Sequence, residues 1–140
     1  MLKQNIKVAA DAIVLAGHGH ERSLLVIKRR FPPYEGMWAI PGGFVEDDED
    51  LEDAAIRELE EETGLRVAAM EQLYTFGKPG RDARGRTITV TYYTVIEEPQ
   101  PVMGADDAAE AAWVPVKDIT ALAFDQMEML QMVLKRLQTT

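Results

Sequence analysis

The most constraining feature of the chain is a 23-residue segment, from Gly43 to Leu65, that contains eleven acidic residues and a single basic one, Arg57. Acidic residues suited to capping a helix stand ahead of an apolar repeat, and Gly64 follows it as a natural helix stop. This pattern predicts a helix over roughly Leu51 to Thr63. An apolar stripe predicts the face by which this helix packs, and its members are Leu51, Ala55 and Leu59.

Three glutamates of this helix, Glu58, Glu61 and Glu62, stand at positions i, i+3 and i+4 and therefore share one face. Each pair of like charges costs a few tenths of a kcal/mol on a solvated helix, but about 3 kcal/mol where the effective dielectric constant is near 20. A hard divalent cation such as Mg²⁺ or Mn²⁺ would make the same cluster favourable. A solvated acidic helix is the alternative, and spacing rather than charge favours the metal site.

The spacing of this segment resembles the Nudix box, the signature of hydrolases that act on a nucleoside diphosphate linked to another group. The box reads G-x(5)-E-x(7)-R-E-U-x-E-E-x-G-U, where U is aliphatic, and every fixed position matches. The matching residues are Gly43, Glu49, Arg57, Glu58, Leu59, Glu61, Glu62, Gly64 and Leu65. The resemblance extends from about Ala10 to the final helix and implies an α/β fold, a Nudix-type α/β/α sandwich with a mixed β-sheet.

The resemblance also implies roles for individual residues. It assigns the binding of Mg²⁺ or Mn²⁺ to the side chains of Glu58, Glu61 and Glu62, assisted by the backbone carbonyl of Gly43. Glu49 and Arg57 would brace the loop before the helix through an ion pair, although a surface pair worth about 0 to 1 kcal/mol is the alternative. The general base would be a glutamate of the box or an acid on a later loop, for which the candidates are Asp106, Asp107 and Glu110.

Two basic clusters outside the box are candidates for substrate binding, because arginine forks suit phosphate oxygens. They comprise Lys28, Arg29 and Arg30 before the box, and Lys78, Arg81, Arg84 and Arg86 after it. Exposed arginines that only improve solubility are the alternative. The segment from Gly77 to Arg86 resembles a loop of the ADP-ribose pyrophosphatase-like branch, and Pro79 stands fifteen residues past Gly64. Several aromatic residues could stack on a base or belong to the core: Phe31, Tyr34, Phe76, Tyr92 and Phe124.

We therefore expect metal-dependent hydrolysis of ADP-ribose to AMP and ribose 5-phosphate. Two alternatives stay open. One is a nucleoside triphosphate pyrophosphohydrolase that sanitises the nucleotide pool, and the other is a sensor that binds a nucleotide sugar without cleaving it. Product identity distinguishes the two enzymes, and the absence of any product would indicate the sensor.

Composition narrows the class of protein further. With 140 residues the chain is expected to form one domain, 1–140, and without cysteine it has neither disulfides nor thiolate chemistry. A net charge of −9 argues against binding to a nucleic-acid backbone. The apolar stretch near the N-terminus is interrupted by Asp11 and is too short to span a bilayer. We expect a cytoplasmic protein with a small-molecule nucleotide substrate and no membrane partner, and the sequence allows a homodimer without demanding one.

Alternating and apolar patterns predict the remaining elements. Strands are expected over Val8 to Ala16, Ser23 to Lys28, Arg66 to Phe76, Thr87 to Ile96 and Ala112 to Val114, with short extended pieces between Gly36 and Gly43. A last helix should carry Phe124, Met127, Leu130, Leu134 and Leu137 on one face, and its methionines Met127, Met129 and Met132 should fill the core. This mixture of elements favours a mixed sheet between helices.

Overall fold

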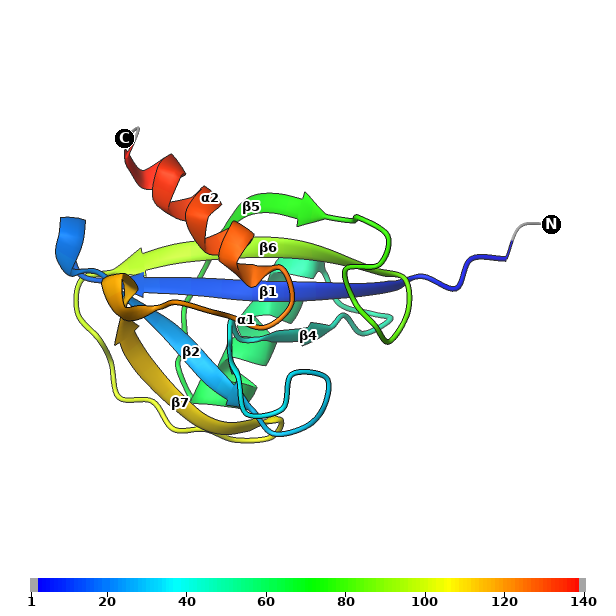
Figure 1. Cartoon of the computed structure of the whole chain (residues 1–140), viewed down its shortest axis with the longest axis horizontal. Coiled ribbons are helices and arrows are strands. Elements are labelled where there is room, and N and C mark those ends of the chain that lie inside the picture. The colour runs from blue at the N-terminus through cyan, green and yellow to red at the C-terminus, as the bar shows by residue number, and fades with distance from the viewer. Residues whose placement is uncertain (1–2, 139–140) are drawn as a thin grey trace.

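In the computed structural model, which describes residues 3–138, a mixed β-sheet lies between two helices, one on each face (Figure 1). The strands are β1 (Lys7–Ala16), β2 (Ser23–Arg29), β3 (Trp38–Ala39), β4 (Gly42–Phe44), β5 (Glu71–Phe76), β6 (Thr87–Ile96) and β7 (Ala108–Pro115). The helices are α1 (Leu51–Thr63) and α2 (Gln126–Gln138), with short 3₁₀ turns at Gly19–Glu21 and Val116–Asp118. The predicted α/β sandwich with a mixed sheet is confirmed.

The sheet is built around β1 and β6, which run parallel along their whole length, from the pair Lys7 and Thr87 to the pair Ala16 and Ile96. The other strand pairs are antiparallel, in the order β3-β2-β1-β6-β5, with β7 beside β2. The other edge of β1 has two partners in turn. Its last residues pair with β2, whereas its first half pairs with β4, so that Asp11 lies opposite Gly42. The first half of β1 is therefore flanked by two glycines.

The two faces of the sheet have separate apolar cores, because successive residues of a strand point to opposite sides. Val14 of β1 lies in the core on the α1 side, together with Leu59 of that helix. Its neighbour Ile13 lies in the core on the α2 side, together with Met129. All four side chains are completely buried. The sheet is thus covered on both faces, which is the layering that the sequence predicts.

Helix α1 begins and ends where the sequence predicts. The Asp50 side chain accepts a hydrogen bond from the backbone N–H of Leu51, which caps the first turn. Gly64 ends the helix in the left-handed conformation, at φ 79°, where its N–H donates to the carbonyl of Glu60. Leu59 packs in the core on the α1 side, and Glu58 and Glu62, which lie near it on the helix, adjoin the glycines of β4.

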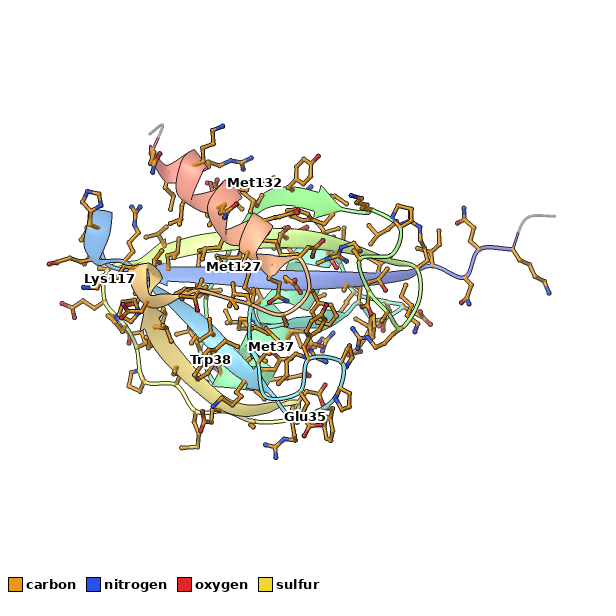
Figure 2. The ribbon with its side chains drawn as sticks, in the orientation of Figure 1. Glu35, Met37, Trp38, Lys117, Met127 and Met132 are labelled. Atoms are coloured by element: carbon orange, nitrogen blue, oxygen red, sulfur yellow. The ribbon has the colours of Figure 1, made fainter. Side chains whose placement is uncertain are left out.

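Helix α2 supplies the second cover, and its methionines belong to the core as predicted. Met129 is fully buried, while Met127 and Met132 are partly buried against the same cluster (Figure 2). The prediction that Phe124 lies on this helix is wrong. The helix begins at Gln126, and Phe124 precedes it with a positive φ of 55°. This left-handed backbone belongs to a turn and not to a helix.

Two predicted strands have different bounds. The strand expected from Arg66 begins only at Glu71, because Leu65 and Met70 first pack into the α1-side core and the Met70 N–H donates to the Glu52 carboxylate. The strand expected over Ala112 to Val114 is longer, since β7 pairs with β2 from Ala108 onward. No helix among residues 3–138 is long and apolar enough to cross a membrane.

Candidate active site

A cavity of about 460 Å³ lies beside the first half of β1, within the size range of small-molecule sites. One wall is acidic, formed by Glu58 and Glu62 of α1 next to the glycines of β4. Another part of the lining is basic and aromatic, and this basic wall is formed by Arg29, Arg81, Arg84, Phe31, Phe44 and Phe124. Ala9, Asp11, Thr87, Thr89 and Gln126 also line the cavity. The cavity therefore combines carboxylates and guanidinium groups in one hollow.

Arg57 organises the acidic wall. Its Nε and Nη2 donate to the two carboxylate oxygens of Glu49 at 2.9 and 2.6 Å, which is a bidentate pair. Its Nη1 donates to Glu58 at 2.9 Å and to both oxygens of Glu61, at 3.2 and 3.1 Å. The hydrogen bond from Arg57 lowers the pKa of Glu49 below its ordinary value. The Arg57 side chain is 26% exposed and that of Glu49 is 15% exposed, so this pair is more shielded than an ordinary surface salt bridge.

The side chains of Glu58 and Glu62 are close enough to share a proton in a hydrogen bond. Burial and the neighbouring Glu58 raise the pKa of Glu62 to about 9, and burial also raises the pKa of Glu58. Glu62 further accepts a hydrogen bond from the N–H of Gly42 at 3.3 Å. A Cβ at Gly43 would lie 2.6 Å from the Glu58 carboxylate, so this close approach requires glycine.

These residues fit a hard divalent cation by their chemistry. Carboxylate and carbonyl oxygens are the preferred ligands of Mg²⁺ and Mn²⁺, and Glu58, Glu62 and the Gly43 backbone adjoin one another. Within residues 3–138, however, no three acidic or histidine side chains already converge around one point. The reason is that Arg57 holds Glu61 away from the cavity, while Glu58 and Glu62 share a hydrogen bond.

The predicted substrate arginines divide into two groups. Arg29, Arg81 and Arg84 line the cavity. Arg30 and Arg86 do not, and their guanidinium groups donate to backbone carbonyls, of Asp106 and Ala108 for Arg30 and of Gly77 for Arg86. The prediction that these last two bind substrate has no support from their position.

Arg81 and Arg84 are held in place by acids that the sequence did not single out. Arg81 forms two hydrogen bonds with Asp125, at 2.8 and 2.7 Å, and a third with the Thr89 hydroxyl at 2.7 Å. Arg84 pairs with the buried Asp82. The loop between β5 and β6 is thus fixed to the start of α2, which positions its arginines at the cavity.

The candidate bases on the later segment are also separated by the fold. Asp107 lines the cavity. Glu110 lies within β7 instead, outside the cavity lining, and its carboxylate is 3.4 Å from the Lys28 ammonium. Asp106 adopts a positive φ of 54° and its carbonyl accepts a hydrogen bond from Arg30. Position therefore favours Asp107 among the three, and Glu110 stays a prediction without such support.

Aromatic residues gather on the basic wall. The Arg84 guanidinium lies 5.1 Å from the ring centre of Phe44 and 5.5 Å from that of Phe124, and Arg29 lies 5.1 Å from Phe124. These are cation–π distances. Phe31 also lines the cavity and is 54% exposed. By contrast, Phe76 and Tyr92 are buried in the two cores, as the alternative interpretation held.

Comparison with known proteins establishes the family. The NUDIX domain model matches residues 5–133. The ADP-ribose pyrophosphatase of Methanocaldococcus jannaschii is 36% identical over 124 residues, which cover 89% of this chain and 70% of that protein. The chain belongs to the Nudix family, and the prediction of a Nudix hydrolase is confirmed.

Other relatives differ in what they do. The ADPR responsive transcriptional repressor NtrR of Acinetobacter baylyi is 31% identical over 134 residues, which cover 93% of this chain but only 54% of the repressor. The chain therefore spans about half the length of that relative. Because relatives include a transcriptional repressor, the prediction that this chain binds no nucleic acid stays a prediction.

Two solved structures place ligands in this fold. The NUDIX domain of Shewanella oneidensis NrtR, complexed with ADP ribose, superposes with a TM-score of 0.88 at 31% identity, over 96% of this chain and 90% of that one. A bifunctional NMN adenylyltransferase/ADP ribose pyrophosphatase from Francisella tularensis, complexed with AMP and a Mn ion, has a TM-score of 0.82 at 30% identity, over 93% of this chain and 41% of that one.

Proposed function

We propose that the chain hydrolyses the diphosphate bond of ADP-ribose, yielding AMP and ribose 5-phosphate, with Mg²⁺ or Mn²⁺ as cofactor. The observation that carries the proposal is the pairing of walls in one cavity. Glu58 and Glu62 supply oxygens for a cation, and Arg29, Arg81 and Arg84 supply guanidinium groups in the same cavity. A diphosphate needs both kinds of neighbour, because its charge is neutralised by cations and by arginine forks. The likeness to an ADP-ribose pyrophosphatase supports this choice of substrate.

In this mechanism Glu58, Glu61, Glu62 and the Gly43 carbonyl would hold the metal. The bound ion would supply positive charge to the diphosphate oxygens and help to activate water. Arg57, fixed by its bidentate pair with Glu49, orients the carboxylates of Glu58 and Glu61.

The basic wall orients the diphosphate, and a carboxylate receives the proton of the attacking water. The cavity position of Arg29, Arg81 and Arg84 suits contact with the phosphate oxygens. Asp107 lines the same cavity and is the candidate base on the later segment, with Glu61 as the candidate within the box. Asp107→Asn should reduce kcat at least about tenfold if Asp107 is the base. Unchanged kcat in that variant would leave the box as the source of the base, because Glu61→Gln should lower kcat in either case through its proposed role as a metal ligand.

A non-catalytic sensor is the second candidate, and a specific observation favours it. The chain resembles the ADPR responsive repressor over 93% of its length. Such a sensor would bind ADP-ribose without turning it over. The complete glutamate set of α1 favours the hydrolase, because binding alone does not require three carboxylates on one helix face.

The deciding experiment is a panel of nucleoside diphosphate derivatives and triphosphates with Mg²⁺ or Mn²⁺, read by product identity. AMP and ribose 5-phosphate from ADP-ribose are the expected products. Release of pyrophosphate from triphosphates would indicate the pool-sanitising enzyme, and a ligand-induced thermal shift without product would indicate the sensor. Glu62→Gln should lose at least about a hundredfold in kcat because the metal loses a charged ligand. Glu60→Gln is the matched control, since Glu60 pairs with the exposed Arg66.

A further inference from the structure

One face of the sheet changes character along β1. Under α2 this face carries Ile13 and Leu15, which belong to the apolar core. Two and four residues before Ile13, the same face carries Asp11 and Ala9, which line the cavity. Thr89, opposite Ala9 on β6, lines it too. The cavity floor is therefore made of small and polar side chains, and the apolar core continues from it along the same face of β1.

Asp11 is a buried carboxylate on this floor without a protein partner. The residue is only 8% exposed, and no hydrogen bond or ion pair of its side chain occurs within residues 3–138. Burial raises its pKa to about 7, and the charge of Arg81 opposes that effect. Arg81 nevertheless directs its donors to Asp125 and Thr89. The Asp11 oxygens are not among the fully buried polar atoms that lack a partner, so they open onto the cavity, where a ligand that donates a hydrogen bond can reach them.

The absence of a side chain at Gly42 leaves room for this carboxylate. A Cβ at Gly42 would lie only 2.1 Å from the Asp11 Oδ1, so the carboxylate occupies the space that any other residue would fill. The two residues are paired across β1 and β4. Asp11 is thus part of a strand that is paired with its neighbour. Such a rigid position is expected of a residue that selects a ligand.

A hydrogen-bond donor is available on the same floor. Gln126 is 4% exposed and lines the cavity, and its Oε1 accepts a hydrogen bond from the Ile40 N–H at 2.8 Å. That bond identifies Oε1 as the engaged atom, which leaves the amide nitrogen as a donor. No protein acceptor for this nitrogen occurs in the part of the chain that the structure describes. The floor therefore presents one acceptor, from Asp11, and one donor, from Gln126.

We propose that Asp11 determines substrate specificity by accepting a hydrogen bond from the uncharged nucleoside or sugar part of the substrate, with the Gln126 amide as a companion donor. The proposal rests on the proposed function, since it takes the substrate to be a nucleoside diphosphate derivative. The donor on the ligand is a sugar hydroxyl or the amino group of the base. A second cation is disfavoured, because the amide nitrogen of Gln126 directs hydrogens and not a lone pair into the cavity.

If Asp11 had only a structural role, its replacement would lower stability and leave ligand affinity unchanged. We expect the reverse. Because the Asp11 carboxylate has no partner among the residues that the structure describes, replacing it should not lower stability by much, and Asp11→Asn should fold as well as the parent. The test therefore reads ligand affinity and not stability. Asp118→Asn is the matched control, since Asp118 is exposed and lies outside the cavity.

The experiment is calorimetric binding of ADP-ribose, AMP and ribose 5-phosphate to a Glu62→Gln background, with and without Asp11→Ala. In that background turnover does not interfere. Loss of a hydrogen bond to a charged group predicts that Asp11→Ala weakens ADP-ribose binding about 10-fold to 100-fold. In the hydrolase itself, Asp11→Ala should raise KM by a similar factor while kcat changes less than about threefold.

Two ligand arms identify the donor. The inosine analogue lacks the base amino group, and deoxy analogues lack single hydroxyls. One of these analogues should lose affinity for the protein with Asp11 but lose no more affinity for Asp11→Ala. The group missing from that analogue is the hydrogen-bond donor, and either outcome supports the proposal. Unchanged affinity of Asp11→Ala for every ligand overturns it while leaving the proposed function intact. Failure of the parent and of the Glu62→Gln background to bind any of these ligands overturns both.

Discussion

Replacing Glu62 by glutamine should make the metal-free protein more stable, although the same change lowers kcat. In the folded chain the pKa of Glu62 is raised to about 9 by burial and by Glu58, from an ordinary value of 4.5. Below pH 4.5 both the folded and the unfolded chain hold the proton, and no cost arises. As the pH increases further, the unfolded chain releases the proton and the folded chain retains it, so stability falls up to about pH 9.

The magnitude follows from the width of that window. A pH of 7.5 is about three units above the pKa of this carboxyl in the unfolded chain, which corresponds to a loss of up to about 4 kcal/mol in the free energy of unfolding. Glutamine resembles the protonated acid, keeps Oε1 as an acceptor for the Gly42 N–H, and has no proton to release. For a domain of this size, relief of that penalty should raise Tm by about 10 °C at pH 7.5. At pH 5 the difference should shrink to less than about 1 kcal/mol.

Thermal unfolding in the presence of a chelator, from pH 5 to 8.5, is the assay. Glu60→Gln serves as control, because the exposed pair of Glu60 with Arg66 should contribute little. Addition of Mg²⁺ should stabilise the parent more than Glu62→Gln, since the ion stabilises whichever protein binds it. The reasoning is refuted if Glu62→Gln and the parent lose stability in parallel as the pH increases.

Three further substitutions test other parts of the site. Gly43→Ala places a Cβ 2.6 Å from the Glu58 carboxylate and should lower kcat at least about tenfold in steady-state assays; parental activity would show that the close approach is dispensable. Arg81→Leu leaves the partly buried Asp125 without its partner and should cost about 3 kcal/mol in denaturant unfolding, which adding Asp125→Asn should largely restore. Glu49→Gln weakens the bidentate pair and should lower kcat, whereas full activity would remove Glu49 from the mechanism.

The sequence was sufficient for the features that local chemistry determines. Helix α1 has its predicted bounds because a capping acid and Gly64 act within one turn of its ends. The strand expected from Arg66 is too long because some of its first residues are apolar without being part of the sheet. Val67 and Met70 pack in the core on the α1 side, which is a contact that alternation along the chain does not reveal.

The residues that sequence reasoning missed are those whose role depends on contacts between distant segments. Asp11 was noted only as an interruption of an apolar stretch, although an acid in a buried strand is itself a signal of a functional position. Gln126 and Asp125 had no such signal, because their partners are Ile40 and Arg81. Glu110 was grouped with Asp107 by proximity, yet β7 extends far enough to pair it with Lys28.

The adjacent glycines of β4 give protein engineers two separate controls. A side chain at Gly42 would press on Asp11, whereas one at Gly43 would press on Glu58. The Gly42 position is the less tolerant of the two, because a Cβ there would also lie 2.7 Å from the Ala10 carbonyl oxygen, and the Gly42 N–H donates to Glu62. A substitution at Gly43 meets only the flexible end of Glu58, whereas one at Gly42 would force β1 and β4 apart.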